Sequence, residues 1–473
     1  MLMNAILTVS QVVFPLVTIP YVSRILHPSG VGKVYFATSF VSYFTMLAQI
    51  GIPVYGVLAC AKVRNKREEL SHIFQELFII NLSLSIILFV LYCFVISTIP
   101  KLLSERFLMF VMGLSIILNS INIDWLYQAL EKYSFITLRS MIFKLISLIG
   151  MLTLIRGTQD YVLYGALTIF PLAASSVTNF AFLRNFVSFP PLKGIKIKNH
   201  IAKTSKFLIL TVMTTVYTNL DLIMLGLIDG DRAAGCYGTA IKIKLGLVTL
   251  IISIIGVLFP RMSYLAGIGS KERFKTTLNK AVSLALSISL PLSIFFIICA
   301  RESIMLIAGK EFNDAIMPMT IIMPTLVFIA MSNVMGMQAL VPLDKENYTI
   351  AATTAGALIN IPANLILIPV LGSSGAAIST LASEMLVFAI IAVCIYKDGM
   401  HIFAGNTLRY PFLSVAAAAA ITVPIRFSAL NRLGSVGVFG ISALSFFTIY
   451  LLLMYAQGDP LTTEVILHRR RNK

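Results

Sequence analysis

The stretch FQELFIINLSLSIILFVLYCFVIST, residues 74–98, decides the fold class of this chain. Its one charged residue is Glu76, close to the beginning, and apolar residues dominate the remainder. About 20 apolar residues in an α-helix cover the roughly 30 Å of hydrocarbon in a bilayer, because each residue adds about 1.5 Å. The stretch therefore predicts a helix that crosses a membrane.

The whole chain has the same character. Its 473 residues are 58% hydrophobic and 12% charged, with a mean hydropathy of +0.90. Soluble domains carry about 25% charged residues, so water is not the expected solvent of this surface. Open sheets would leave backbone groups unpaired in lipid, and membrane barrels alternate apolar and polar residues. We predict an all-α polytopic membrane protein.

Apolar runs of spanning length recur about fourteen times. They cover residues 2–22, 34–59, 74–98, 107–129, 136–155, 160–183, 206–228, 235–259, 279–300, 318–341, 349–370, 374–396, 409–428 and 434–456. The first run has no basic lead and no cleavage site of small residues, so we expect a retained span and not a signal peptide. Basic residues concentrate in the loops on the side of the termini, which predicts that both termini are cytoplasmic.

The two halves of the chain resemble each other weakly. The short turns after the first span of each half contain Gly32 and Gly235, which are followed by similar charged loops. Parallel repeats are typical of transporters, although any two helical hairpins share such features. We predict an N-terminal six-helix lobe at 1–183, a cytoplasmic linker at 184–205, a C-terminal six-helix lobe at 206–396, and two further helices with a basic tail at 397–473.

Signals for other functional classes are weak. The net charge of +17 resides mostly between spans, which favours a role in membrane orientation or a cationic cavity and predicts no nucleic-acid partner. The five cysteines form no CxxC pair and the five histidines no cluster, so we expect no metal and no cofactor. There is no GxxxxGK[ST] phosphate loop. Asp229-Gly-Asp231 lies in a loop too short for a catalytic domain, so we do not expect an enzyme.

Ionisable residues inside the predicted spans are the candidate functional residues. Each costs about 2.5–3.5 kcal/mol at the centre of a spanning helix on insertion scales. The basic candidates, which could bind an anion, are Arg24, Lys144, Lys242 and Lys244. The acidic candidates, for ion coupling or a buried charge pair, are Asp124, Asp221 and Glu384.

Asp221 and Lys242 have similar predicted depths in neighbouring spans. They form either a structural ion pair or a pair for which a substrate or ion competes. Lys244 is two positions from Lys242, so the two project to different faces of a helix, and we expect Lys242 to face inward. Lys144 is likewise either an anion contact or part of a structural pair.

Two acidic candidates allow two interpretations each. Glu384, near the middle of its predicted span, either couples to an ion or forms a buried pair with a lysine. Asp124 adjoins Trp125, the only tryptophan. Because tryptophan favours the membrane interface, we expect water to reach Asp124.

Five motifs in order along the chain resemble those of the polysaccharide repeat-unit flippases of O-antigen and capsule assembly. They are FPLVTIPYVSRILHPSGVG at 14–32, IDWLYQALEKY at 123–133, YTNLDLIMLG at 217–226, GCYGTAIKI at 235–243 and LFPRMS at 258–263. The resemblance covers nearly the whole chain. It implies the multidrug/oligosaccharidyl-lipid/polysaccharide (MOP) exporter superfamily, with two six-helix lobes and two more helices around a central cavity.

The resemblance also implies a function. The expected substrate is an undecaprenyl-diphosphate-linked oligosaccharide, moved from the cytoplasmic to the outer leaflet of the bacterial inner membrane by alternating access, with a proton or sodium gradient as the hypothetical driver. Expected partners are membrane lipid and the polysaccharide polymerase and chain-length machinery. The alternatives are a peptidoglycan lipid-precursor flippase, a cation-coupled multidrug exporter of the same fold, and a polytopic polymerase or ligase.

Overall fold

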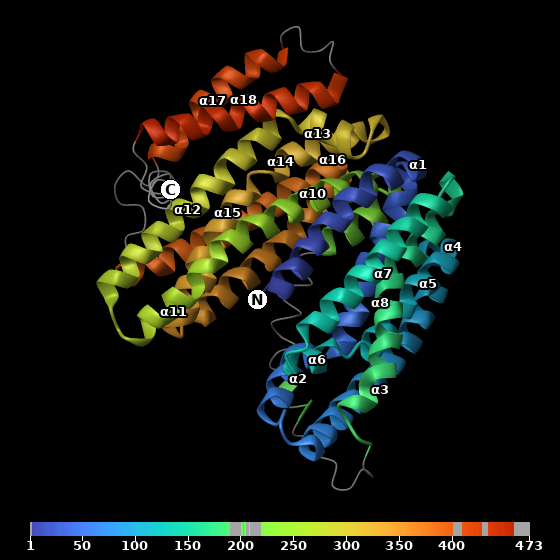
Figure 1. Cartoon of the computed structure of the whole chain (residues 1–473). Coiled ribbons are helices and arrows are strands. Elements are labelled where there is room, and N and C mark those ends of the chain that lie inside the picture. The colour runs from blue at the N-terminus through green and yellow to red at the C-terminus, as the bar shows by residue number, and fades with distance from the viewer. Residues whose placement is uncertain are drawn as a thin grey trace. The chain divides into compact units, whose positions relative to one another are not determined.

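The computed structural model describes residues 2–189, 200–201, 203–204, 208, 219–400, 409–427 and 434–457. Every regular element in these ranges is a helix (Figure 1). Ten of the described helices are long and apolar enough to cross a membrane. The prediction of an all-α polytopic membrane protein is therefore confirmed. The number fourteen stays a prediction, because residues 209–218 of the predicted span 206–228 lie outside the described ranges.

Two long helices are bent by single residues with positive φ. Helix α1 (Leu2–Gln49) changes direction at His27, which has φ 57° and ψ 174°. Helix α16 (Glu346–Lys397) does so at Gly372, with φ 54° and ψ −131°. The first kink separates the predicted spans 2–22 and 34–59, and the second separates 349–370 and 374–396. Each long helix is thus two membrane helices without an intervening loop.

The chain forms two compact units, Met1–Gly235 (unit 1) and Cys236–Lys473 (unit 2). Beyond α1, unit 1 contains α2 (Ile52–Lys62), α3 (Arg67–Thr98), α4 (Pro100–Ser104), α5 (Arg106–Ile121), α6 (Asp124–Ala129), α7 (Tyr133–Leu154), α8 (Tyr161–Phe182) and the helix Asn219–Ile228. Helix α1 packs against α3, α5, α7 and α8. The predicted lobe boundaries at 183 and 206 stay predictions.

Part of the predicted linker folds back onto unit 1. His200 lies 2.8 Å from a Glu76 carboxylate oxygen through Nε2 and 2.9 Å from the Tyr55 hydroxyl through Nδ1. Glu76 lies in α3 and Tyr55 in α2, so His200 fixes this point of the linker to two helices of unit 1. Residues 190–199, 202 and 205 of the predicted linker, and the basic tail from 458 onward, lie outside the described ranges.

Helix α10 (Asp231–Ile255) begins in unit 1 and continues into unit 2. The other helices of unit 2 are α11 (Phe259–Gly267), α12 (Lys271–Ile298), α13 (Ala300–Ile307), α14 (Ile316–Ile322), α15 (Thr325–Asn333), the π-helix Val334–Leu340, α16, α17 (Arg409–Phe427) and α18 (Gly434–Ala456). Figure 1 shows α17 and α18 side by side, next to α12 and α13. Phe295 of α12 and Phe446 of α18 are buried at this contact, with ring centroids 5.6 Å apart.

The two glycines of the predicted repeat meet in unit 1. A Cβ atom on Gly32 would lie 1.8 Å from the Asp231 carbonyl oxygen, and one on Gly235 would lie 1.9 Å from the Pro28 carbonyl oxygen. Real Cβ atoms do not approach other atoms so closely, and backbone atoms cannot rotate away. The turn after His27 and the first turn of α10 therefore pack backbone to backbone, which only glycine permits.

Replacing either glycine should destabilise this contact. We expect Gly32→Ala and Gly235→Ala each to lower the free energy of unfolding by about 1–3 kcal/mol, as overpacking does. The measurement is the apparent melting temperature of the purified protein in detergent. Gly440→Ala is the control, because a Cβ there meets nothing within 4 Å. Equal melting temperatures for all three variants would contradict the packing.

His27 should respond in the opposite direction. Its φ of 57° with ψ of 174° is a combination that glycine adopts readily and other residues adopt at a cost of about 1–3 kcal/mol. We expect His27→Gly to raise the free energy of unfolding by about 1 kcal/mol, since the relief of strain is partly offset by glycine's entropy. His27→Ala keeps the strain and should give no gain in melting temperature. A gain for alanine equal to that for glycine would show that the histidine side chain, and not the backbone, is unfavourable.

Candidate functional site

Unit 1 contains a polar cavity of about 410 Å³. It lies between the second half of α1, α5, α8 and the helix Asn219–Ile228. The polar lining residues all carry hydroxyl or carboxamide groups: Thr38, Ser42, Thr45, Gln49, Ser115, Asn119, Thr168 and Asn219. The apolar ones are Val41, Met46, Met112, Ile169 and Leu172. None of the described lining residues has an ionisable side chain, so these residues offer hydrogen bonds without charge.

Helical spacing places the polar groups on common faces. Thr38, Ser42, Thr45 and Gln49 follow the i, i+4, i+7, i+11 pattern, which is one face of α1. The hydroxyls of Thr38 and Ser42 donate to the carbonyls of Val34 and Ser39 at 2.7 and 2.6 Å. Such bonds to the same helix use the hydroxyl proton and leave the oxygen lone pairs to accept from a ligand.

Two carboxamides connect α1 with α5 at this cavity. Gln49 Nε2 donates to Asn119 Oδ1 at 3.2 Å, and Asn119 Nδ2 donates to the Ser115 carbonyl at 2.8 Å. Each amide has further donor and acceptor capacity. The pair can therefore contact a ligand that both donates and accepts hydrogen bonds.

A second, smaller cavity adjoins Lys144. Its volume is about 140 Å³, and it lies between the first half of α1 and α7. The lining is apolar apart from Lys144 and Ser10: Phe14, Val17, Met141, Leu145 and Leu148. The Lys144 ammonium donates to Ser10 Oγ at 2.9 Å, and its side chain is half-buried. One cation in an apolar groove suits a ligand that combines an anionic group with a hydrocarbon chain.

The other predicted cations occupy different positions. Arg24 is exposed on α1, where a guanidinium nitrogen donates to the Pro20 carbonyl. Lys242 and Lys244 lie in the unit 2 part of α10; Lys242 is half-buried and Lys244 is buried. The expectation that Lys242 faces inward stays a prediction. Whether either one contacts substrate stays a prediction.

Two acidic candidates are also buried. Asp221 lies in the helix Asn219–Ile228 of unit 1 with 4% of its surface exposed, and Glu384 lies in α16 of unit 2 with 7% exposed. The predicted pairing of Asp221 with Lys242 would join residues of the two separate units and stays a prediction. The ion-coupling role of Asp221 and Glu384 is a prediction as well.

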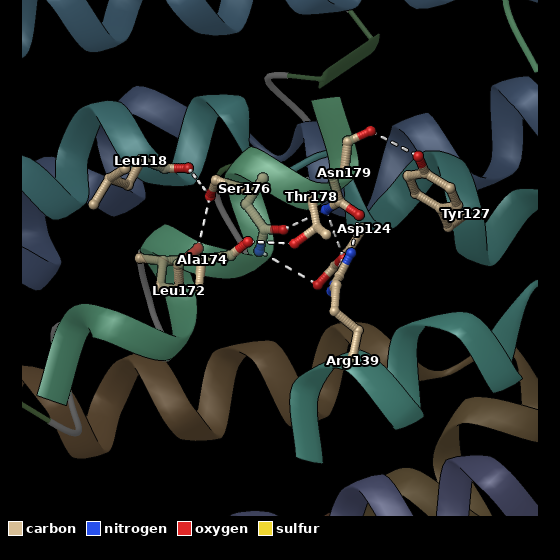
Figure 2. A network of polar contacts seen from close by, with 10 residues as sticks. Leu118, Asp124, Tyr127, Arg139, Leu172, Ala174, Ser176, Thr178 and Asn179 are labelled. Carbon is tan, nitrogen blue, oxygen red and sulfur yellow. Dashed lines mark hydrogen bonds and ion pairs between the residues drawn. The ribbon is translucent and has the colours of Figure 1, made fainter. Parts of the chain in front are cut away.

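Asp124 belongs to a polar network at the beginning of α6 (Figure 2). Its Oδ1 lies 2.6 Å from Arg139 Nη2 and accepts from Asn179 Nδ2 at 2.9 Å. Arg139 also donates to Asn179 Oδ1, and the Tyr127 hydroxyl donates to the Asn179 carbonyl at 2.7 Å. The network joins α6, α7 and α8 through one buried guanidinium, which has 5% of its side chain exposed. Asp124 is therefore a member of a charge pair in unit 1.

Sequence analysis did not identify this network. Arg139 could have pointed to it, because it is an ionisable residue inside the predicted span 136–155. Trp125 is 4% exposed and stacks on Phe74, with ring centroids 5.8 Å apart, so it packs inside unit 1, and its place relative to the membrane interface stays a prediction. Gly56 leaves the space for this packing, since a Cβ there would lie 2.6 Å from the indole.

Comparison with known proteins identifies the family. The profile of the family described as "Polysaccharide biosynthesis protein" matches residues 1–266, more than half of the chain. The chain belongs to the polysaccharide biosynthesis protein family. A second profile, MatE, matches residues 208–366 of this family member.

Two relatives carry the name "Putative O-antigen transporter". The one from Escherichia coli K12 is 21% identical over 83% of this chain and 95% of its own length. The one from Shigella dysenteriae is 23% identical over 79% of this chain and 93% of its own length. These relatives and the family match support a transporter of this class and not an enzyme, as the sequence predicts.

Solved structures show the same fold. "Lipid II flippase MurJ, inward closed conformation" superposes with a TM-score of 0.80 over 98% of this chain and all of that one, at 15% identity. An inward-facing multidrug resistance MATE family transporter of the MOP superfamily gives 0.65 over 82% of this chain and 95% of that one, at 13% identity. The MOP-type fold that the resemblance implied is confirmed for this polysaccharide biosynthesis protein.

Removing the cation of the Asp124 network should destabilise unit 1. We expect Arg139→Gln to lower the free energy of unfolding by on the order of 3 kcal/mol, because it leaves Asp124 without its charged partner. The double variant Asp124→Asn with Arg139→Gln should recover part of that loss. Thermal unfolding in detergent measures both.

The control for this prediction is Arg64→Gln. That substitution breaks the exposed Arg64–Glu131 pair, whose side chains are 45% and 69% exposed, and surface pairs contribute about 0–1 kcal/mol. If Arg139→Gln is as mild as Arg64→Gln, the buried network does not hold the three helices together.

Proposed function

We propose that this transporter is a flippase for an undecaprenyl-diphosphate-linked oligosaccharide repeat unit, which it moves from the cytoplasmic to the outer leaflet by alternating access. The observation that carries the proposal is the pair of cavities in unit 1. One is lined by neutral hydrogen-bonding groups, and the other by apolar side chains around a lysine. A lipid-linked oligosaccharide combines those same three chemistries: sugar hydroxyls, phosphate and hydrocarbon.

The diphosphate accounts for a lysine in this environment. A lysine inside a membrane segment is costly unless an anion or polar group accompanies it. Lys144 now contacts only a neutral hydroxyl, Ser10, among the interactions described for it. Bonds from a cation to phosphate are stronger than those to a neutral oxygen. A diphosphate would therefore bind better than the serine that holds the ammonium in its absence.

The family and the relatives support the carbohydrate part. Both relatives are named for O-antigen transport, and the family is described by polysaccharide biosynthesis. The proposed location is the bacterial inner membrane with both termini cytoplasmic, as the distribution of Lys and Arg predicts. Polymerase and chain-length proteins are the partners that such a substrate would require.

Gradient coupling is part of the proposal. Asp124 is already held by Arg139 and Asn179, so binding a proton or sodium ion there would disrupt a structural pair. Asp221 and Glu384, buried in separate units, are the stronger candidates. The test is the transport rate in vesicles with an imposed proton gradient or an imposed sodium gradient. A rate that neither gradient changes would contradict ion coupling.

The rival substrate is a peptidoglycan lipid precursor. The high structural similarity to a lipid II flippase is an argument for this rival substrate. At 15% identity, however, the similarity concerns the fold alone. The two substrates share a prenyl diphosphate and differ in the glycan. Two strains distinguish them: one lacks its repeat-unit flippase, and the other lacks its peptidoglycan-precursor flippase. The protein should rescue only the first strain if the proposal is correct, and only the second if the rival is correct.

Lys144 provides the mutational test. In a strain without its own repeat-unit flippase, we expect Lys144→Gln to reduce lipid-linked repeat units accessible at the outer leaflet by about tenfold or more, since a hydrogen bond to a charged group contributes about 1.5–3 kcal/mol. Lys144→Arg should retain most of the activity. Lys62→Gln, the same change at an exposed position, is the control. Full activity of Lys144→Gln at equal expression would exclude this lysine from the phosphate site.

A further inference from the structure

The polar cavity of unit 1 is lined by neutral hydrogen-bonding side chains, a property that binding a lipid-linked solute does not by itself require. The hydrogen-bonding side chains among its described lining residues are all neutral, and they project from one face of α1 and from the facing α5, α8 and Asn219–Ile228 helices. Neutral polar groups inside membrane helices incur a desolvation cost unless hydrogen bonds satisfy them, and the carboxamides of this lining have donor and acceptor capacity beyond their described bonds. A volume of about 410 Å³ lies within the range of small-molecule sites, about 300–1,000 Å³.

We propose that this cavity binds uncharged sugar residues of the substrate, and that Gln49 and Asn119 are its main specificity determinants. The inference rests on the proposed function and extends it by assigning the sugar and the phosphate to different sites. Sugar hydroxyls both donate and accept, and carboxamides and hydroxyls offer complementary groups of both kinds. The apolar lining residues, such as Met112 and Ile169, supply a surface for the C–H face of a sugar ring.

The hydrogen-bond pattern indicates which atoms are available. Gln49 uses one amide N–H on Asn119, and its carbonyl oxygen accepts no hydrogen bond from the described residues. Thr38, Ser42 and Thr168 donate their protons to carbonyls of their own helices. The site therefore presents mostly acceptors together with the remaining amide N–H groups, which matches a ligand rich in hydroxyl donors.

The polar cavity is separate from the Lys144 groove, which supports uncharged sugars as its ligand. Lys144 contacts the first half of α1 at Ser10, whereas the polar cavity uses the second half, from Thr38 to Gln49, beyond the kink at His27. With no cation among the described residues of its lining, the polar cavity offers a carboxylate no charged partner from them. An acidic sugar would be desolvated there without a partner, which disfavours it. The cavity should therefore discriminate against acidic glycans.

The test compares three prenyl lipids binding to the purified full-length protein in nanodiscs. They are undecaprenyl diphosphate without sugar, the same lipid with an uncharged oligosaccharide, and the same lipid with a uronic-acid oligosaccharide of equal length. We expect the uncharged glycan to tighten binding relative to the sugar-free lipid and the acidic glycan to give no gain. Gln49→Leu and Asn119→Leu should each reduce the gain by about three- to tenfold, as expected for one or two neutral hydrogen bonds.

Controls separate this inference from the proposed function. Gln159→Leu makes the same chemical change at an exposed position and should leave the gain intact. Gln49→Leu should leave the affinity for the sugar-free lipid unchanged. Lys144→Gln should lower the affinity for all three lipids by the same factor.

Two results would overturn the inference. If wild-type protein binds the sugar-free lipid but gains nothing from the uncharged glycan, or if the gain survives in both Gln49→Leu and Asn119→Leu, the sugar site is wrong and the flippase proposal stands. If wild-type protein binds none of the three lipids, both fail.

Discussion

The absence of water in the bilayer is the constraint on which the structure depends. Helices satisfy their own backbone groups, so the described residues form helices throughout. The same constraint makes each polar side chain inside a span expensive and therefore informative. In unit 1 these groups include a structural network around Arg139, a neutral cavity and a lysine in an apolar groove. The network stabilises the helices, and the two cavities leave hydrogen-bonding and charged groups available to a ligand.

Helix α1 contributes to both cavities. Its two halves, separated at His27, contribute to different cavities, and the turn after the kink packs against the beginning of α10 through Gly32 and Gly235. A change in the direction of either half would alter one cavity relative to the other. Binding of a diphosphate near Ser10 and of a sugar near Gln49 would therefore act on the same helix, which offers a physical basis for linking substrate binding to conformational change.

Much of the fold was predictable, because apolar runs of spanning length report membrane helices directly. Lys144 could be selected from the sequence as a candidate for a related reason: one charge in such a run is conspicuous. The neutral cavity was less predictable. The spacing of Thr38, Ser42, Thr45 and Gln49 is visible in the sequence, but hydroxyl residues are frequent in membrane helices, and the facing Asn119 is apparent only in three dimensions. The pairing of Asp124 with Arg139 depends on the turn between α6 and α7, and the burial of Trp125 on the space left by Gly56.

Reconstituted transport tests the central claim most directly. The purified protein would be placed in vesicles whose outer leaflet receives undecaprenyl diphosphate bearing a labelled, uncharged oligosaccharide, and the label would be followed into the inner leaflet. The account predicts transfer that is fast relative to protein-free vesicles and that falls when Lys144 is replaced by Gln but not by Arg. Transfer no faster than in protein-free vesicles, from protein shown to be folded and inserted, would contradict it.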